Sequence, residues 1–420
     1  MKITLTQFRP NTAEAVWTDC FAQAIAELHK AGGGVLTVPT GEYSTGPIEL
    51  CSNMELHLEP GAVIRFLNDP AAFPLQECQY EGRISHRPKP CLSAFNAENV
   101  ALTGFGVLDG CGAPWWAAQR ARTLANGRPY LLHFENVTHL RVCGVQLRNS
   151  PAWTVHPLNC VDVLIEDVSI CNPYNSPNTD GINPESCRDV RILNCRVDVG
   201  DDCITLKSGT EETPSPAPCE NIVIANCLLV HGHGGIVIGS EMSGGVRNVT
   251  VTNCVFTGTD RGLRVKTRRR RGGCVENLRL SNLVMESVFC PFVFNMYYSC
   301  GTAEKDRWVW EKTPYPVDGG TPAFRNIRIN GVTVVGATAS AGFFYGLAES
   351  PIDGLSLTDC HIEMARGAAP EKPAMMGNLE PMSARGFFLR NAKNVEFHNV
   401  TLKNADGEAY DTDESVDGEF

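Results

Sequence analysis

The sequence lacks long apolar runs. None approaches the about 20 apolar residues of a membrane-spanning helix, so we expect no membrane partner. The first ten residues lack the apolar segment and small-residue cleavage site of a signal peptide, which leads us to expect no export. Helical periodicity is almost absent as well. With 43% hydrophobic and 20% charged residues, the chain is nevertheless not disordered over most of its length.

The sequence also has fewer basic than acidic residues, and it lacks cysteines and histidines at the spacing of a metal site. The chain has 36 Lys and Arg against 47 Asp and Glu, a formal net charge of −11, which argues weakly against nucleic acid as a partner. The 18 cysteines include no Cys-x-x-Cys pair and no His/Cys cluster with zinc-like spacing, so we predict no metal and no cofactor. Many cysteines without an export signal indicate reduced thiols in a cytoplasmic protein.

What the sequence does have is a repeat. Ten segments carry an apolar residue at a first position, an apolar residue two positions later, and Gly, Asn or Asp four positions later. The first positions are Val100, Leu140, Val163, Val190, Ile222, Val249, Leu278, Ile327, Leu355 and Val395. Because Gly, Asn and Asp tolerate positive φ, each segment is predicted to be a strand, a one-residue bend and a second strand.

The spacing of the repeat predicts the fold. Neighbouring first positions are separated by between 23 residues (Leu140 to Val163) and 49 residues (Leu278 to Ile327). Units of this length that cannot bury their own apolar faces stack into a solenoid. We therefore predict an all-β, right-handed parallel β-helix of roughly ten or more coils, forming a single domain over residues 1–405.

Two segments stand outside the repeat. Residues 18–31 predict a helix with a Thr or Asp N-cap, whose apolar residues Phe21, Ile25 and Leu28 would cover the first coil. Residues 406–420 contain seven acidic residues and no basic one, and we expect them to form a disordered tail.

Charged residues recur at equivalent positions of successive coils, counted from the first position of each repeat. Ile204, Ile236 and Leu263 each fall fourteen residues after a first position and are expected to point inward from one sheet. Asp180 and Asp202 then share a position two residues before an inward residue. Because residues of equal phase stack about 4.8 Å apart, these two carboxylates should be neighbours.

The next coils add a histidine and two bases. Asp201 and His233 share the position three residues before an inward residue, and Arg264 and Lys266 follow one coil further on. Clustered carboxylates suit glycoside hydrolysis, in which one acts as acid and another as base. Crowding would raise the pKa of Asp201 and make it the acid, while Asp180 and Asp202 would hold the water.

Four short segments resemble the signatures of the polygalacturonase family, family 28 of the glycoside hydrolases. They occur in the family's order, and nearly the whole chain is similar; they are Asn178-Thr-Asp-Gly181, Gly200-Asp-Asp202, Gly232-His-Gly234 and Arg264-Val-Lys266. Val107-Leu-Asp-Gly110 and the segment from Ile238 to Val246 look more like bacterial exo-acting members than fungal endo-acting ones.

The resemblance implies inverting hydrolysis of α-1,4 bonds in polygalacturonate, and the expected lack of export favours oligogalacturonides. It makes Asp201 the general acid, Asp180 and Asp202 the base pair, and His233 a supporting residue. Arg264, Lys266, Asn178 and Tyr298 or Tyr297 are then substrate-binding residues. An inverting acid and base should lie about 6.5–9.5 Å apart.

Other interpretations stay open. Arg268, which begins the run Arg268–Arg271, is predicted to meet substrate carboxylates, with a solvated turn or a nucleic-acid patch as alternatives. A rhamnogalacturonan or xylogalacturonan hydrolase is an alternative within the same family. Outside hydrolysis, a pectate lyase or a non-catalytic pectin-binding β-helix would share the fold.

Overall fold

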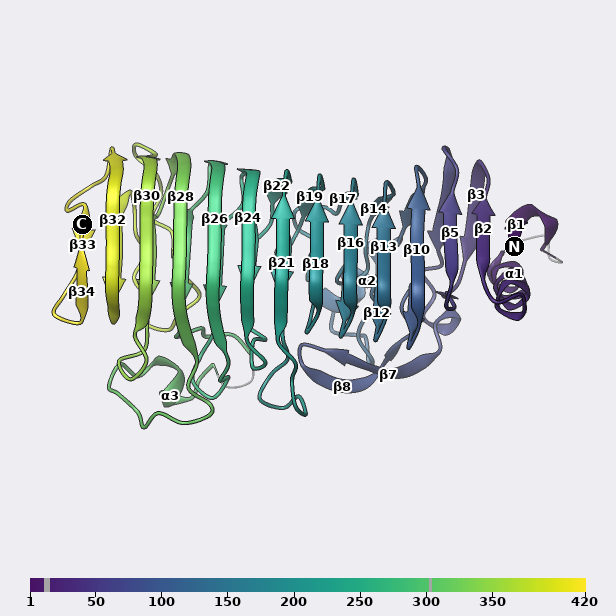
Figure 1. The fold of residues 1–420 in the computed structure, drawn as a ribbon, viewed down its shortest axis with the longest axis horizontal. Helices are drawn as coiled ribbons and strands as arrows, with labels where there is room; N and C mark the ends of the chain where they lie inside the picture. The colour runs from purple at the N-terminus through teal and green to yellow at the C-terminus, as the bar shows by residue number, and fades with distance from the viewer. Residues whose placement is uncertain (11–15, 302–303) are drawn as a thin grey trace. The chain divides into compact units, whose positions relative to one another are not determined.

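The computed structural model describes residues 1–10, 16–301 and 304–420 (Figure 1). Their contacts divide the chain into two compact units, Met1–Asp201 and Asp202–Phe420. In the first unit, parallel strands follow one another coil by coil on three faces. In the second, the strands of two of these faces are joined into long continuous strands. The predicted right-handed parallel β-helix is confirmed.

The first unit has three parallel sheets. One contains β1 (Lys2–Thr4), β2 (Gly34–Val38), β5 (Met54–Leu58), β10 (Glu98–Gly104), β13 (Thr138–Cys143), β16 (Val161–Glu166) and β18 (Arg188–Leu193). The second contains β3 (Gly41–Thr45), β6 (Ala62–Phe66), β11 (Val107–Asp109), β14 (Gln146–Arg148), β17 (Ser169–Cys171) and β19 (Arg196–Val199). The third contains β4 (Ile48–Glu49), β9 (Leu92–Phe95), β12 (Leu132–Glu135) and β15 (Val155–Leu158).

The first unit also contains a hairpin and short helices outside the parallel sheets. The antiparallel hairpin of β7 (Leu75–Tyr80) and β8 (Arg83–Pro88) leaves the parallel sheets between β6 and β9. The helices are α1 (Thr18–Lys30), α2 (Ala113–Arg120) and the 3₁₀ turns η1 (Leu5–Gln7) and η2 (Pro70–Ala72).

The second unit contains two ladders. One contains β21 (Cys219–Ala225), β22 (Leu228–His231), β24 (Val246–Thr257), β26 (Cys274–Glu286), β28 (Ala323–Ala337), β30 (Ile352–Met364), β32 (Ala392–Lys403) and β34 (Val416–Glu419). The other contains β20 (Ile204–Leu206), β23 (Ile236–Ile238), β25 (Arg261–Lys266), β27 (Cys290–Asn295), β29 (Ser340–Tyr345), β31 (Arg385–Arg390) and β33 (Tyr410–Asp411). The short helix α3 (Arg307–Trp310) lies between β27 and β28.

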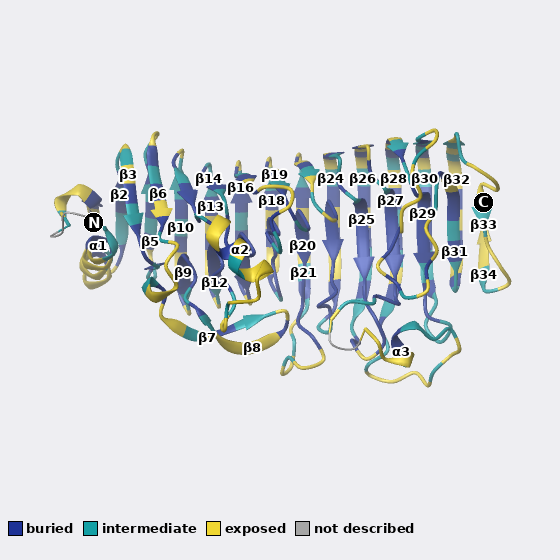
Figure 2. Ribbon diagram, turned by 180° about the vertical axis from the view of Figure 1, so that it is seen from behind, coloured by how far each residue is buried: buried dark blue, intermediate teal, exposed yellow. Residues whose placement is uncertain are grey.

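The predicted repeat sets the register in both units. Val100 pairs with Leu140, Leu140 with Val163 and Val163 with Val190, and the series from Ile222 to Val395 pairs in the same way. The bend residues have positive φ, for example 54° at Asp167 and 57° at Asn194. Figure 2 shows the buried stripes that result along the strands.

The repeat also extends further toward the N-terminus than the sequence pattern indicated. Met54 pairs with Val100, and Gly34 pairs with Met54, so two further coils precede the predicted ones. Leu58 occupies the position that Gly104 fills in the next coil, which hid the bend signal.

The predicted capping helix is present with a different start. Helix α1 buries Phe21 and Leu28 but leaves Ile25 partly exposed. The predicted Thr or Asp N-cap is wrong, because Trp17 occupies the N-cap position and no side chain caps the helix. Thr18 Oγ1 instead accepts a 2.7 Å hydrogen bond from the backbone nitrogen of Gly46, which ties the helix to the first coils.

The C-terminal segment is not the disordered tail that its charge predicted. Strand β33 pairs with β31, and β34 pairs with β32. Arg390 neutralises two of the acids: its Nη2 lies 2.7 Å from Asp411 Oδ1, and its Nε lies 3.1 Å from Asp413 Oδ2. The ring of Phe420 packs against that of Phe397, with 5.5 Å between the ring centroids. The segment thereby covers the open edge of the last coil, which would otherwise expose unpaired backbone groups.

No helix among the described residues combines the length and the apolar character needed to cross a bilayer.

Candidate active site

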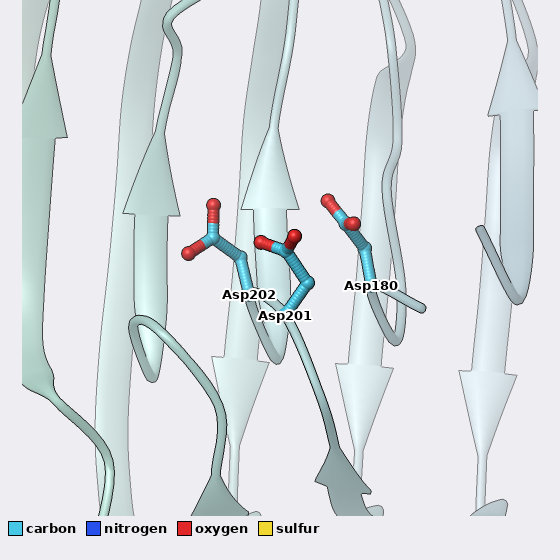
Figure 3. A group of neighbouring side chains, drawn as sticks. All are labelled: Asp180, Asp201 and Asp202. Atoms are coloured by element: carbon cyan, nitrogen blue, oxygen red, sulfur yellow. The ribbon is translucent and has the colours of Figure 1, made fainter. Parts of the chain in front are cut away.

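The three predicted acids come together in space. Asp180 lies in the loop after β17, and Asp201 and Asp202 lie between β19 and β20. One carboxylate oxygen of each lies within 4.8 Å of the others (Figure 3). Asp180 and Asp202 are buried, whereas Asp201 is half-buried. The nearest oxygens are therefore closer than the expected acid–base separation of about 6.5–9.5 Å.

The loop that carries Asp180 is fixed within the first unit. Asn183 Nδ2 donates a 3.1 Å hydrogen bond to Asp180 Oδ2, and the backbone oxygen of Asp180 accepts one of 2.9 Å from Thr154. Thr179 Oγ1 lies 2.5 Å from Ser176 Oγ and accepts a hydrogen bond from the nitrogen of Gly200. Asn178 and Gly200 therefore belong to one connected pair of loops.

Position 200 has no room for a side chain, so it requires glycine. A Cβ at this position would lie 2.4 Å from the backbone oxygen of Ser176 and 2.7 Å from that of Pro173. Real Cβ atoms do not approach so closely, so the glycine before the paired aspartates lets the two loops meet.

Asp202 is held as a carboxylate in the second unit. Arg264 Nη1 donates a 3.1 Å hydrogen bond to its Oδ1, and Lys266 Nζ donates one of 2.7 Å to its Oδ2. Burial opposes the charged form, but Lys266 and Arg264 outweigh it, and His233 adds to their effect. The pKa of Asp202 consequently lies well below its usual range.

His233 is an exposed residue of the Gly-His-Gly loop between β22 and β23. Glycines make this loop possible: a Cβ at Gly235 would lie 2.2 Å from the Phe256 ring, and one at Gly234 would lie 2.5 Å from Val237. The contact between His233 and Asp201 expected from the sequence stays a prediction.

The structure distinguishes the two candidate tyrosines. The ring of Tyr298 lies 5.4 Å from Lys266 Nζ and 6.0 Å from the guanidinium carbon of Arg264. Tyr297 instead faces Lys312 and Arg269 and is fully buried. Tyr298 is therefore the tyrosine that lies beside the basic pair.

Arg268 is buried and paired with an acid. Only 3% of it is exposed, and its Nη2 donates a 2.9 Å hydrogen bond to Glu211 Oε1, while Arg271 binds the other oxygen of Glu211. The guanidinium anchors a loop and is already occupied by a carboxylate, which argues against the predicted substrate contact. Arg270 is the exposed arginine of this run.

Two residues that the repeat pattern did not indicate also contact the predicted site residues. Arg128 Nη2 donates a 2.6 Å hydrogen bond to Asn178 Oδ1, and Arg264 Nη2 lies 3.0 Å from the sulfur of Met375. Both come from long loops outside the repeat, 50 and 111 residues away in the chain. The repeat pattern does not predict the paths of such loops, so it could not indicate that these two residues reach the site.

Comparison with known proteins identifies the class of protein. Residues 36–367 match the family model Glycosyl hydrolases family 28. A probable polygalacturonase of Vitis vinifera is 30% identical over 363 residues, which cover 84% of this chain and 72% of the relative. The protein is therefore an enzyme, a glycoside hydrolase. More particularly, the chain belongs to glycosyl hydrolases family 28, as its motifs predicted.

Solved structures agree with this assignment. An exopolygalacturonase from Thermotoga maritima superposes with a TM-score of 0.76 at 30% identity, covering 96% of this chain and 92% of the other. A family 28 exopolygalacturonase from Yersinia enterocolitica shares the fold, with a TM-score of 0.80 at 19% identity over 100% of this chain and 78% of the other.

Proposed function

We propose that the protein is an exo-acting polygalacturonase that hydrolyses α-1,4-galacturonosidic bonds in oligogalacturonides with inversion. The observation that carries this proposal is the buried Asp202, held between Arg264 and Lys266 in a group with Asp180 and Asp201. Family membership and polygalacturonase relatives support it.

The electrostatics support a division of roles among the acids. Lys266 and Arg264 keep Asp202 charged, which suits a base that activates water. Asp201 is the most exposed of the three and suits the general acid that protonates the leaving oxygen. Asp202 and Asp180 then hold the attacking water.

The basic pair supports an acidic substrate. Two cations, Arg264 and Lys266, bind the carboxylate of Asp202, and Tyr298 lies beside them. Arg and Lys also bind carboxylates of ligands by charge-assisted hydrogen bonds, which suits a uronate at the leaving-group side.

The β7–β8 hairpin supports exo action. His133 and His156 project from the outer face of the sheet β4-β9-β12-β15, yet both are fully buried. The hairpin helps to cover them: Tyr130 Oη donates a 2.6 Å hydrogen bond to the backbone oxygen of Gln79, and Gln79 Nε2 donates one of 2.7 Å to Glu185.

The cover continues to the loop of Asp180. Tyr80 stacks on Trp153 with 4.8 Å between ring centroids, and Arg87 lies 3.9 Å above Tyr80. Arg87 also donates a 3.1 Å hydrogen bond to the backbone oxygen of Arg128, which in turn holds Asn178. A sugar chain could not continue along this face, so cleavage near one end is expected.

Product analysis tests the proposal. Hexagalacturonate should yield monogalacturonate from the first time points, whereas a ladder of sizes would mean endo action. Products absorbing as unsaturated uronates would favour a lyase. Binding without new reducing ends would favour a non-catalytic protein, and activity restricted to substituted galacturonans would favour a rhamnogalacturonan or xylogalacturonan hydrolase.

We further propose that the enzyme works in a reducing, cytoplasmic compartment and that it is bacterial. All 18 cysteines lie among the described residues, and none of them is in a disulfide, which supports the location. Cell fractionation tests the location, and enrichment in an exported fraction would contradict it.

A further inference from the structure

Lys312 is a cation of the second unit that has no carboxylate partner among the described residues. It lies in the segment between α3 and β28 and is partly exposed. Its Nζ lies 3.2 Å from the ring centroid of Tyr297 and 4.6 Å from that of Tyr345, and 4.0 Å from the sulfur of Met376. Among the residues that the structure describes, no carboxylate oxygen lies within 4.0 Å of this ammonium group.

The neighbouring cations differ from Lys312 because they are neutralised. Arg269 binds both oxygens of Glu349, at 2.5 and 3.0 Å, and Arg390 binds Asp411 and Asp413. An ammonium group removed from water normally requires a charged partner. The aromatic rings supply only part of that stabilisation.

Arg269 fixes the backbone on both sides of Lys312. Its Nη1 donates a 2.7 Å hydrogen bond to the oxygen of Glu311, and its Nη2 donates one of 3.1 Å to the oxygen of Thr313. The lysine is therefore held in place before any ligand arrives, which lowers the entropic cost of binding.

Lys312 also lies in line with the basic pair. Lys266 pairs with Asn295, and Asn295 pairs with Tyr345 on the next strand, so Lys312 stands over a position two strands beyond Lys266. At ~4.8 Å per strand this is roughly 10 Å along the stack. Two consecutive residues connect the basic pair with Lys312: the sulfur of Met375 contacts Arg264, and the sulfur of Met376 contacts Lys312.

We propose that Lys312, seated on Tyr297 and Tyr345, is a second binding site for a uronate carboxylate, further along the substrate than the site of Arg264 and Lys266. The inference rests on the proposed function and extends it. It makes Lys312 a determinant of chain-length preference: a chain long enough to reach it gains one charge-assisted contact, and a dimer does not.

Burial, and then the nearby Arg269, lowers the pKa of Lys312 to about 7. A bound carboxylate would reverse this effect and favour the charged form.

The test compares substrate lengths. Steady-state hydrolysis of di-, tri-, tetra- and hexagalacturonate is measured for the wild-type protein, Lys312→Met, Lys312→Arg and the control Lys403→Met, which removes an exposed lysine of β32. We expect Lys312→Met to lose about ten-fold or more in kcat/KM on tetra- and hexagalacturonate, and to be unchanged on the dimer. Lys312→Arg should retain most of the preference for long chains, and Lys403→Met all of it.

Two outcomes would overturn the inference: an equal loss at every chain length, which indicates a structural role, or no loss at any length. Lys312→Gln provides a second neutral variant if the methionine variant is poorly folded. Absence of hydrolysis of every galacturonate by the wild-type protein would instead refute the proposed function. Calorimetric titration of hexagalacturonate into the wild-type and Lys312→Met proteins then still tests the carboxylate site.

Discussion

Lys266 Nζ donates a 2.7 Å hydrogen bond to Asp202 Oδ2 in a place where both side chains are almost completely buried. The contact explains why the second aspartate of the Gly-Asp-Asp motif stays charged although burial opposes its charge. Because the folded pKa lies below the unfolded value of about 3.9, the ion pair stabilises the fold above that pH. This contribution is lost as the pH falls through the folded pKa.

Replacing Lys266 should therefore change the acid side of the pH profile. Lys266→Met removes one of the cations that keep Asp202 charged, so the pKa of Asp202 rises. We expect the acid limb of kcat/KM to move to higher pH, with a lower maximum. The pH–rate profile of the variant is compared with that of Lys403→Met. An unshifted acid limb would show that Asp202 does not govern it.

Asp201→Asn should remove hydrolysis while leaving the fold intact. The side chain is half-buried, and it is proposed to donate the proton to the leaving oxygen. Loss of a general acid costs about 10²–10⁴ in rate. The rate on trigalacturonate and the melting temperature are measured together, with the exposed Asp417→Asn as control. Near-normal turnover of Asp201→Asn would reject its assignment as the acid.

The stereochemistry of the product deserves a direct measurement, because the nearest oxygens of the acid group lie within 4.8 Å of one another. Separations of about 5–5.5 Å between the two carboxyl groups are typical of retaining enzymes. We nevertheless expect inversion, since Asp180 and Asp202 together can hold a water. Proton NMR during the first turnovers should show the β-anomer of the new reducing end. Initial formation of the α-anomer would establish retention.

The core and the acid group could be predicted because both follow the coil period. The pairing of Ile204 with Ile236 and of Ile236 with Leu263 places Arg264 and Lys266 at fixed positions in the sheet, as their phase indicated. Arg128 and Met375 could not be predicted, because they come from loops whose paths no period describes. The acidic C-terminal segment was misjudged for another reason: its charge suggested solvation, but Arg390 neutralises part of it.

Space rather than backbone conformation should make Gly200 irreplaceable. Gly200→Ala would push a methyl group against the backbone of Ser176 and Pro173, which separates the loops of Asp180 and Asp201. Overpacking of this kind costs about 1–3 kcal/mol, and we expect activity to fall more than stability. Gly319→Ala is the matched control, because a Cβ there would meet nothing within 4 Å. Equal activities of the two variants would contradict the packing argument.

Opening the hairpin should change the products. Replacing residues 76–87 by a short glycine linker would uncover the face around Tyr130 and Trp153, which the hairpin covers through Tyr80 and Gln79. We expect dimers and trimers among the first products from hexagalacturonate, where the intact protein gives monomer. Ile84→Ser, at an exposed position of β8, serves as the control. Unchanged monomer release by the shortened protein would show that the hairpin does not set the cleavage position.

Lys312 should give binding of long chains its own pH dependence. The groups that face it are Arg269 with its partner Glu349, and the phenol rings of Tyr297 and Tyr345. As the pH rises through about 7, the free enzyme loses the charge of Lys312, so KM for hexagalacturonate should rise while KM for the dimer does not.

The stability of the fold should change with pH in the opposite direction to the binding of long chains: it should increase as Lys312 loses its charge. The unfolded chain, with a lysine pKa of about 10.4, binds more protons than the fold between pH 7 and that value, so Lys312 costs most stability below about pH 7. Lys312→Met should therefore melt at a higher temperature than the wild-type protein at pH 6, and the difference should shrink toward pH 10. A methionine variant that is less stable at pH 6 would show that the charge of Lys312 stabilises the fold, which contradicts a charge retained for binding at the expense of stability.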